Sequence, residues 1–404
     1  MPGTGKTFLI DYITSELKLK DYEVAFGTPT GKAASVLIQK GRDAATIHRL
    51  IYTPVEVELE TEVNGETVKT KSVEYVKKIE IPKYKLIVLD EISMVEEEIM
   101  KDLLSFGIPI LCTGDKGQLP AIFKSNILLS TPDYTLTEIV RQAKENPIIQ
   151  LATMARNKIP IPYGKYGKDV IVVSQNSLSA GAFKNLLLKA DQVVCGTNST
   201  RNYINNEIRK HKGIDVIKDS LPIEGDKVIC TVNNWELFLD KENKYNLVNG
   251  TIGTVSQSIV KDKSINLGAF NFKPDFLDSI TEDILFDYKI FTDQEFSYDM
   301  HQKVFVLPND KYLLRESPGP RKKNENFSDY RNRILKYVRA SKSSLHEKMI
   351  NRFEYAYAIS CHKAQGSEFD KVVLFDESFR FGNDSEKWLY TGITRAKKKL
   401  VIIR

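Results

Sequence analysis

The most informative part of this sequence is an apolar run that ends in two carboxylates, Leu86-Ile87-Val88-Leu89-Asp90-Glu91. It lacks the alternation of apolar and polar residues that marks a half-exposed strand, so it predicts a strand buried on both faces. The runs at 24–26 and 108–112 have the same character, and amphipathic stretches separate the three. Strands that alternate with helices predict a parallel sheet with right-handed crossovers.

A glycine-rich loop precedes the first helical pattern, Gly3-Thr4-Gly5-Lys6-Thr7. Its glycines allow backbone N–H groups to approach phosphate oxygens, and the N-terminus of a following helix favours negative charge. In such a loop Lys6 reaches the β- and γ-phosphates of ATP, and the Thr7 hydroxyl binds Mg²⁺. The helix itself is predicted from apolar residues at helical spacing, namely Phe8, Leu9, Tyr12, Ile13 and Leu17.

The two carboxylates after the buried run fit the same nucleotide site. Asp90 is placed to hold Mg²⁺, and Glu91 is placed to orient and deprotonate the attacking water. Gln118 follows the next predicted strand in Gly114-Asp115-Lys116-Gly117-Gln118 and is a candidate sensor of the γ-phosphate. Ligands bind at the carboxyl ends of parallel strands. Taken alone, Asp90 and Glu91 fit a helix N-cap equally well, but the loop at Lys6 favours the nucleotide site.

A second α/β core is predicted further along the chain. The runs at 193–195, 372–375 and 400–403 again read as buried strands, separated by helical stretches such as 201–211. We therefore expect two α/β cores. The first occupies 1–150, and the second occupies 151–254 plus 351–404. Between the two parts of the second core, residues 255–350 have no α/β alternation and are expected to form an inserted, mostly β subdomain.

A β-hairpin is predicted inside the first core, at 52–80. Residues 55–63 alternate apolar or β-branched residues with glutamates, and Asn64-Gly65 follows, which is the strongest short-range hairpin signal. A two-residue turn there places two glutamates opposite two lysines, Glu60 with Lys69 and Glu58 with Lys71. Each such cross-strand pair is worth about 0.2–1 kcal/mol. No aromatic residue lies at the turn of the hairpin. If the hairpin contacts a nucleic acid, the side chains that stack on its bases must therefore lie elsewhere. An ordinary surface hairpin remains the alternative.

Composition limits the class of protein. The 404 residues are 42% hydrophobic, enough for two or three domains, and a net charge of +5 is compatible with a nucleic-acid partner without requiring one. The four cysteines lie far apart, which argues against a zinc site or a disulfide framework. No apolar run approaches membrane-spanning length, so we expect no membrane partner. Reduced thiols suggest the cytoplasm of a bacterial or phage-infected cell.

Taken in order, the motifs resemble those of superfamily 1B helicases of the RecD-like and phage Dda type. The resemblance spans nearly the whole chain: PGTGKT at 2–7, TPTGKAA at 28–34, LDEISM at 89–94, GDKGQLP at 114–120, LTEIVRQ at 136–142, CGTNSTRN at 195–202, GDKVICTVNN at 225–234, AYAISCHKAQGSEFD at 356–370 and LYTGITRAKKKL at 389–400. It implies two RecA-like P-loop NTPase cores, ATP hydrolysis in the cleft between them, and 5′→3′ movement on single-stranded DNA.

The resemblance also assigns roles to individual residues. It makes Arg141 and Arg395 arginine fingers and places Gly366 and Glu368 at the nucleotide, with Glu368 near the ribose. It implies a DNA-binding set that comprises Pro29, Thr30, Lys32, Thr46, His48, His362, Lys363 and Gln365. The hairpin resembles a strand-separating pin, and 255–350 resembles an inserted SH3-like subdomain. Implied partners are single-stranded DNA, DNA forks, and a single-stranded-DNA-binding, replication or recombination protein.

One departure concerns the beginning of the chain. The family has a further glycine and a buried strand before its phosphate loop, together with a glutamine motif that reads adenine, whereas this sequence begins at Met1. We therefore expect an incomplete chain or a misassigned start, and weak ATP binding by this form. Two alternatives stay open. One is a helicase subunit of a larger nuclease or relaxase complex. The other is a truncated, catalytically weak remnant that binds single-stranded DNA.

Overall fold

The computed structural model describes residues 6–63, 66–120, 131–136, 145–262, 267–287, 291, 303–307, 311–314, 329 and 346–404. Internal contacts divide the chain into two units. The first unit comprises Met1–Val57, Glu74–Lys212 and Tyr357–Arg404, and the second comprises Glu58–Val73 and Gly213–Ala356. Within the described ranges, no helix is long and apolar enough to cross a membrane.

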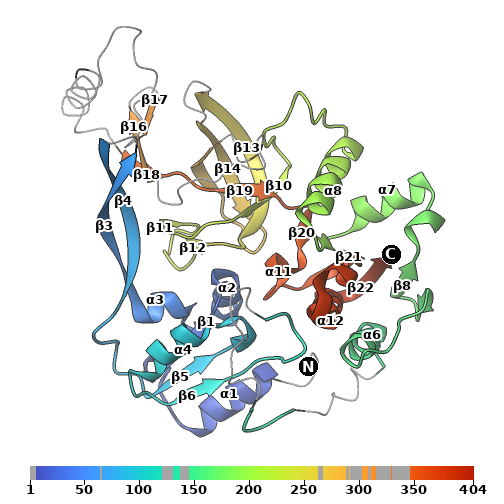
Figure 1. Ribbon diagram of the computed structural model, residues 1–404, viewed down its shortest axis with the longest axis horizontal. Coiled ribbons are helices and arrows are strands. Elements are labelled where there is room, and N and C mark those ends of the chain that lie inside the picture. Colours follow the sequence, from blue (N-terminus) through green and yellow to red (C-terminus); the bar gives the residue numbers. More distant parts are fainter. Residues whose placement is uncertain are drawn as a thin grey trace. The chain divides into compact units, whose positions relative to one another are not determined.

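The first core is built on a four-stranded sheet in the order β2-β1-β5-β6 (Figure 1). The strands are β1 (Val24–Thr28), β2 (Ala44–Thr46), β5 (Leu86–Leu89) and β6 (Ile110–Cys112), and every neighbouring pair is parallel. This confirms the predicted parallel α/β fold. All three predicted runs form strands, and the run before Asp90 ends where β5 ends.

Alternate residues of these strands face opposite layers of helices. Ala25, Ile87 and Leu89 pack in one cluster with residues of α3 (Ile47–Ile51) and α4 (Glu97–Leu104). Val24, Phe26 and Val88 pack in another with α1 (Lys6–Glu16) and α2 (Gly31–Gln39). The sheet is therefore buried on both faces, as its unbroken apolar runs predict.

Helix α1 follows the prediction in position but not in the face that it buries. The spacing of apolar residues favours a core face through Phe8 and Tyr12, yet these side chains are 76% and 55% exposed. Ile10 and Thr14, one helical turn apart, are buried instead. The spacing of apolar residues therefore predicts the helix correctly, but the apolar side chains that gave this prediction lie at the surface of the described structure.

The second core contains a six-stranded sheet in the order β20-β9-β21-β22-β8-β7. Its strands are β7 (Gly164–Tyr166), β8 (Val170–Val173), β9 (Gln192–Cys195), β20 (Ala358–Ser360), β21 (Phe369–Phe375) and β22 (Ala396–Ile403). All pairs are parallel except β7 with β8. The runs predicted at 193–195, 372–375 and 400–403 are the buried parts of β9, β21 and β22.

Helices cover both faces of this second sheet. On one face, α7 (Ala180–Lys189) and α8 (Asn198–His211) contribute Leu187 and Ile204 to a core with Val193. Elsewhere, α6 (Pro147–Arg156) packs against α12 (Ser385–Ile393), and the four-residue α11 (Cys361–Ala364) follows β20. Helix α12 approaches β21 so closely that a Cβ at Gly392 would lie 2.8 Å from Leu374 Cδ1.

The second unit is β-rich. Its largest sheet has the order β15-β14-β13-β10-β19, with β10 (Lys227–Cys230), β13 (Ile252–Asp262), β14 (Leu267–Pro274), β15 (Thr281–Asp287) and β19 (Phe353–Tyr355), all antiparallel. Its core is aromatic, with Phe270, Phe272 and Phe353 fully buried. Smaller sheets pair β11 (Asn234–Phe238) with β12 (Asn246–Leu247), and β16 (Lys303–Leu307) with β17 (Lys311–Leu314) and β18 (His346–Met349).

The boundaries of this β region differ from the expected 255–350. Strand β10 lies in the middle of the antiparallel sheet, between β13 and β19, although residues 227–230 were expected in the second α/β core. Val228 and Cys230 are buried, so the run looks like any core strand. An apolar run predicts burial, but it does not specify the sheet that buries it.

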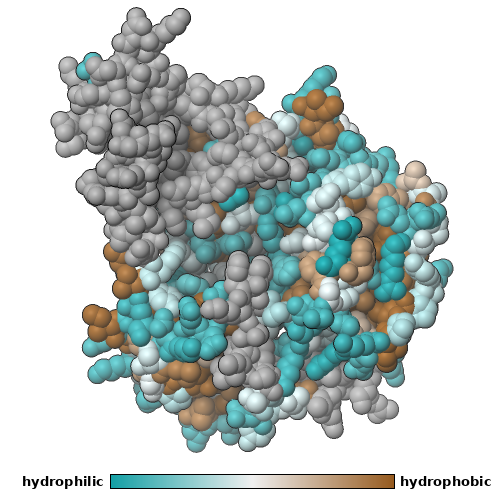
Figure 2. Space-filling model, viewed as in Figure 1, coloured by the Kyte–Doolittle hydropathy of each residue, from teal (hydrophilic) through white to brown (hydrophobic). Residues whose placement is uncertain are grey.

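The region predicted as a hairpin contains β3 (Tyr52–Val63) and β4 (Glu66–Lys77), which pair in a two-stranded sheet. Asn64 and Gly65 lie outside the described residues, as do the side chains of the predicted Glu–Lys pairs. The four cysteines are free thiols. In the view of Figure 2, hydrophilic residues cover most of the described surface, and hydrophobic residues form separate small patches.

Candidate nucleotide and nucleic-acid site

Asp90 lies where β5 ends, and its carboxylate is held from two sides. The Thr113 hydroxyl donates to Asp90 Oδ1 at 2.6 Å, and the backbone N–H of Glu91 donates to the same oxygen at 2.9 Å. Among the described residues, Oδ2 accepts no hydrogen bond. One oxygen therefore fixes the carboxylate and the other is available to a ligand, which is the geometry that a metal-binding carboxylate needs.

Glu91 combines backbone strain with a buried charge. Its φ of 55° and ψ of 41° lie in the left-handed region, which costs a residue other than glycine about 1–3 kcal/mol. Its Oε2 is buried and has no hydrogen-bond partner in the described structure. Burial raises the pKa of the carboxyl, and the negative charges of Asp90 and Asp115 raise it further. Strain and a raised carboxyl pKa are features of catalytic bases.

Two cations from different cores oppose that shift. Lys6, the first residue of α1, and Arg395, from the second core, both act on Glu91 and lower its pKa. Lys6 also acts on Asp115. The structure thus brings Lys6, Asp90, Glu91 and Arg395 to one place, with two carboxylates and two cations around it.

Arg395 is buried, with 4% of its surface exposed. Its guanidinium donates to the carbonyl of Thr391 at 3.0 Å and to the carbonyl of Ser367 at 3.1 Å, and to the Thr394 hydroxyl at 2.9 Å. Among the described residues no carboxylate forms an ion pair with it. Its hydrogen bonds there go to neutral groups, so its charge remains available to a nearby anion.

The segment after β6 carries the next two polar groups. Asp115 is buried, and its carboxylate accepts hydrogen bonds from the Tyr390 hydroxyl at 2.5 Å and the Gly117 backbone at 3.0 Å. Burial opposes its ionisation, but the pKa of Asp115 lies below its ordinary value, and Tyr390, Lys6 and Gly117 are among the groups that lower it. Gln118 is also buried, and its Oε1 has no hydrogen-bond partner in the described structure. This unpaired oxygen and that of Glu91 both accept hydrogen bonds, so they fit a donor or a cation, such as the water or metal ion that accompanies a bound phosphate.

Side chains of the second core bind the backbone of this same segment. The Thr391 hydroxyl accepts a hydrogen bond from the Leu119 N–H at 2.9 Å, and Gln365 Nε2 donates to the Leu119 carbonyl at 2.9 Å. Gln365 was predicted to bind DNA, but it is 5% exposed and its amide group faces the first core. Its neighbours in the sequence motif gave no indication of this, because the partner is 246 residues away.

The hydroxyl groups of two residues that were predicted to bind DNA also cap helices. Thr30 and Thr46 are the N-caps of α2 and α3, where their Oγ1 atoms accept hydrogen bonds from Ala33 and Arg49. The motif of Thr30 also meets the second core, because a Cβ at Gly366 would lie 3.8 Å from Thr30 Oγ1. The same Cβ would lie 3.5 Å from Ala33 Cβ, so the two predicted phosphate-binding segments lie side by side. Pro29, Lys32 and Lys363 are half-buried.

The two predicted DNA-binding histidines have aromatic neighbours. The exposed His48 ring lies 5.4 Å from Tyr52 and 6.0 Å from Tyr75 of β4. The half-buried His362 lies 6.0 Å from Phe381, which stacks on Trp388 at 5.3 Å. Burial lowers the pKa of His362. Within the described ranges, no cluster of potential ligands includes either histidine as a metal site.

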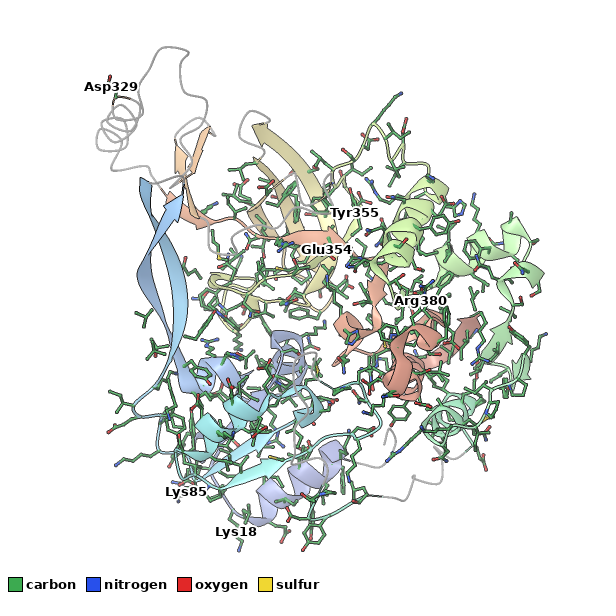
Figure 3. The ribbon with its side chains drawn as sticks, viewed as in Figure 1. Lys18, Lys85, Asp329, Glu354, Tyr355 and Arg380 are labelled. Atoms are coloured by element: carbon green, nitrogen blue, oxygen red, sulfur yellow. The ribbon has the colours of Figure 1, made fainter. Side chains whose placement is uncertain are left out.

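A loop beyond β21 supports the motif at 195–202. Glu377 accepts hydrogen bonds from the backbone of Gly196 at 2.6 Å and Thr197 at 3.0 Å, and from the Thr200 hydroxyl at 2.7 Å. Arg380, labelled in Figure 3, lies 3.7 Å from Glu377 in the adjoining segment η5 (Ser378–Asp384). The start of α8 is therefore capped by a carboxylate that the sequence motif did not include.

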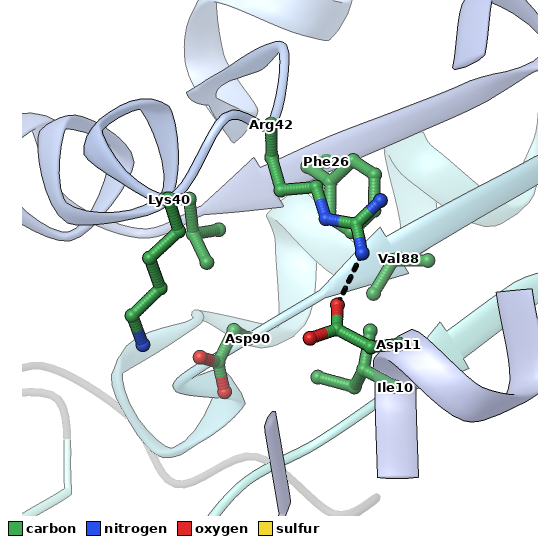
Figure 4. Close-up of a pocket in the computed structure, with 8 residues that line it drawn as sticks. Ile10, Asp11, Phe26, Lys40, Arg42, Val88 and Asp90 are labelled. Atoms are coloured by element: carbon green, nitrogen blue, oxygen red, sulfur yellow. Dashed lines mark hydrogen bonds and ion pairs between the residues drawn. The ribbon is translucent and has the colours of Figure 1, made fainter. Parts of the chain in front are cut away.

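A small cavity of about 50 Å³ lies beside Asp90 in the first core (Figure 4). It is lined by Ile10, Asp11, Phe26, Leu37, Lys40, Arg42, Val88 and Asp90. Arg42 forms an ion pair with Asp11 across it at 2.5 Å. This volume suits one or two water molecules and is too small for a nucleotide base.

Some predicted site residues lie outside the described structure: Gly3, Thr4, Gly5, Arg141 and the side chain of Thr7. Glu368 is exposed. Sequence reasoning missed Thr113, which orients Asp90, and also Tyr390 and Thr391, which bind Asp115 and the Leu119 backbone beside the site. Thr113 directly precedes the GDKGQLP motif and Tyr390 is inside the last motif, so both had a positional signal.

Two protein families match the chain at its two ends. Residues 1–162 match an AAA domain, and residues 355–403 match the UvrD-like helicase C-terminal domain. The ATP-dependent RecD2 DNA helicase of Deinococcus radiodurans is 34% identical over 160 residues, which are 37% of this chain and 20% of RecD2. The ATP-dependent DNA helicase Dda of phage T4 is 30% identical over 186 residues, 42% of this chain and 38% of Dda.

A longer match involves the RecBCD enzyme subunit RecD of Buchnera aphidicola, which is 23% identical over 99% of this chain and 69% of RecD. The chain thus spans less than half the length of RecD2 and of Dda. The two family matches contain Lys6, Asp90, Glu91 and Arg395, the residues that meet at the candidate site. This chain is therefore similar at its two ends to an AAA domain and to a UvrD-like helicase C-terminal domain, and in part to DNA helicases of the RecD and Dda type.

Proposed function

We propose that this protein is an ATP-dependent DNA helicase that moves 5′→3′ on single-stranded DNA. The observation that carries the proposal is the surroundings of Glu91, a strained carboxylate with an orphaned buried oxygen. One cation from each core, Lys6 and Arg395, acts on it. A site that needs both cores to be complete links hydrolysis to their relative movement, which is the requirement for a motor.

Each residue has a distinct task in ATP hydrolysis. Lys6 binds the β- and γ-phosphates, and Arg395 stabilises the negative charge that develops on the transferring phosphoryl group. Arg141 is proposed as a second finger. Glu91 accepts the proton of the attacking water, and burial raises the pKa of its carboxyl, which makes the carboxylate a stronger base. Gln118 detects the γ-phosphate through its amide NH₂ group, and its unpaired amide oxygen accepts a hydrogen bond from a donor such as the attacking water.

Asp90 and Thr7 are the proposed ligands of Mg²⁺, which when bound neutralises charge between the β- and γ-phosphates. Thr113 fixes the orientation of Asp90 by its hydrogen bond of 2.6 Å. Gly366 and Glu368 are proposed at the nucleotide on the side of the second core. Carboxylate and hydroxyl oxygens are the ligands that Mg²⁺ prefers.

Single-stranded DNA is proposed to cross the two segments that meet at Thr30 and Gly366. Lys32 and Lys363 neutralise phosphates, and Pro29 and Thr46 line the same path. His48 and Tyr75 provide an aromatic surface on which a base can stack. The second histidine, His362, extends this path on the second core. Backbone contacts are the same at every base, so binding is expected to be salt-sensitive and independent of sequence.

The sheet of β3 and β4 is proposed as the pin that separates strands at a fork, and the β-rich second unit as an SH3-like subdomain. The aromatic residue that the hairpin turn lacks is supplied near its base by Tyr75 of β4.

The experiment that tests this function compares ATP hydrolysis with and without oligo(dT), followed by unwinding of duplexes with either a 5′ or a 3′ single-stranded tail. We expect oligo(dT) to stimulate hydrolysis and only the 5′-tailed duplex to be unwound. Unwinding of only the 3′-tailed duplex contradicts the direction, and hydrolysis indifferent to DNA contradicts the motor.

A further inference from the structure

We propose that an inter-core clamp couples DNA binding to ATP turnover. The clamp comprises residues 115–119 of the first core and three side chains of the second core, Gln365, Tyr390 and Thr391. Through it, DNA bound at the second core sets the position of Gln118. This inference rests on the proposed function and adds a means of regulation to the same site.

Three hydrogen bonds make up the clamp, and all of them cross between the cores. Tyr390 donates to Asp115 at 2.5 Å, Leu119 N–H donates to Thr391 Oγ1 at 2.9 Å, and Gln365 donates to the Leu119 carbonyl at 2.9 Å. These five residues are between 0% and 5% exposed. Water cannot replace such buried bonds when they break, so each favours one relative position of the two segments.

The position of Gln118 between the anchors explains why the clamp would affect catalysis. Asp115 precedes Gln118 by three residues, and Leu119 follows it directly. Leu119 is held through both its N–H and its carbonyl, so the backbone on one side of Gln118 cannot shift without breaking a bond to the second core. The amide oxygen of Gln118 is buried and has no partner in the described structure.

On the other side, the clamp reaches the proposed DNA path and the arginine finger. Gln365 directly follows α11, whose residues His362 and Lys363 are proposed DNA contacts. The Thr391 carbonyl accepts the hydrogen bond from Arg395 Nε at 3.0 Å, so the residue that holds Leu119 also holds the finger. A movement of α11 or α12 on DNA is therefore transmitted to Gln118 and Arg395 together.

Tyr390 and Thr391 are positioning residues, because they act through Asp115, Leu119 and Arg395. A purely structural role is the competing explanation. It predicts that removal of their bonds lowers basal and DNA-stimulated turnover in equal proportion. A coupling role predicts that basal turnover is kept and that stimulation is lost. Allosteric coupling is typically about 5- to 150-fold, so a large effect is measurable.

The test uses Tyr390→Phe and Thr391→Val in the full chain. Each removes one bond and nearly preserves volume. The matched control is Tyr52→Phe, because Tyr52 donates the same kind of bond to a carboxylate, Asp102 Oδ2 at 2.6 Å, entirely within the first core. For every variant, kcat and KM for ATP are measured without DNA and with saturating oligo(dT), and melting temperature reports folding.

We expect both clamp variants to keep basal kcat within about twofold and to lose at least fivefold of the stimulation by oligo(dT), whereas Tyr52→Phe keeps the wild-type ratio. If stimulation survives in both folded clamp variants, or if basal and stimulated kcat fall equally, the clamp is wrong while the proposed function stands. A wild-type protein without any DNA-stimulated turnover overturns the proposed function and the clamp together.

Discussion

Replacement of Arg395 by lysine should separate the charge of the proposed arginine finger from its geometry. Three nitrogens of Arg395 donate hydrogen bonds in the structure, through Nε to Thr391, Nη1 to Ser367 and Nη2 to Thr394. The Thr394 hydroxyl also donates to the Thr391 carbonyl at 2.9 Å, so these two groups keep a partner without Arg395, and the Ser367 carbonyl is the acceptor that can lose its donor. At about 1–3 kcal/mol for an unsatisfied acceptor, we expect the free energy of unfolding to fall by about 1–3 kcal/mol.

The fall in kcat should be larger than the loss of folding stability alone would cause. Removal of an arginine finger lowers kcat by about 10³–10⁵-fold, or about 4–7 kcal/mol in the activation barrier. Arg395→Lys keeps the charge but not the planar fork, so we expect kcat near the lower end of that range. The assay is DNA-stimulated ATP hydrolysis, normalised to the folded fraction from denaturant unfolding at the same temperature.

Arg404→Lys is the matched control. Arg404 also joins separate elements, through Asp376 at 2.6 Å and the Ile161 carbonyl at 2.6 Å, but it has no contact with the proposed nucleotide site. It should lose stability and keep kcat within a few-fold. If folded Arg395→Lys hydrolyses ATP within tenfold of the wild-type rate, Arg395 is a structural arginine and the finger assignment is refuted.

Three further predictions concern the same machinery. Thr113→Val removes the hydrogen bond to Asp90 Oδ1 and should raise the Mg²⁺ concentration for half-maximal hydrolysis by about 10–100-fold; an unchanged Mg²⁺ titration would count against Asp90 as a ligand. Burial raises the pKa of Glu91, and a general base must be unprotonated to act. As the pH is lowered, kcat should therefore begin to fall at a pH above the ordinary pKa of glutamate. A fall in kcat only at the ordinary glutamate pKa would contradict this. Shortening the hairpin across 61–68 should abolish unwinding while sparing DNA-stimulated hydrolysis, since translocation needs only the two cores; unchanged fork unwinding would favour an ordinary surface hairpin.

Much of the fold could be predicted because buried parallel strands have a strong signal. The run before Asp90 has no polar residue, and it forms a strand with the predicted bounds, Leu86–Leu89. The sequence also predicts that β10 is buried, but it does not predict which sheet contains it, because its partner strands β13 and β19 are distant in sequence. The spacing of apolar residues also predicted helix α1, but it did not predict that Phe8 and Tyr12 are exposed. Such spacing shows that a helix has an apolar face, and it does not show whether another element packs against that face.

The candidate site divides in the same way. Glu91 and Asp90 follow directly from the end of a strand, a local feature of the sequence. The bond between Tyr390 and Asp115 joins residues 275 positions apart, and no local pattern predicts which tyrosine reaches which carboxylate. Gln365 is an example. Its motif predicted a contact with DNA, but its side-chain amide donates a hydrogen bond to the carbonyl of Leu119.

The central claim is that Glu91 is the base of a DNA-stimulated ATPase. Its most direct test is the substitution Glu91→Gln, which preserves shape and removes the proton acceptor. Binding of a fluorescent ATP analogue and hydrolysis of ATP are measured on the same folded preparation, with saturating oligo(dT) and Mg²⁺. We predict that the variant binds the analogue as the wild type does and hydrolyses ATP at least about 10²-fold more slowly. Hydrolysis at close to the wild-type rate would contradict the account.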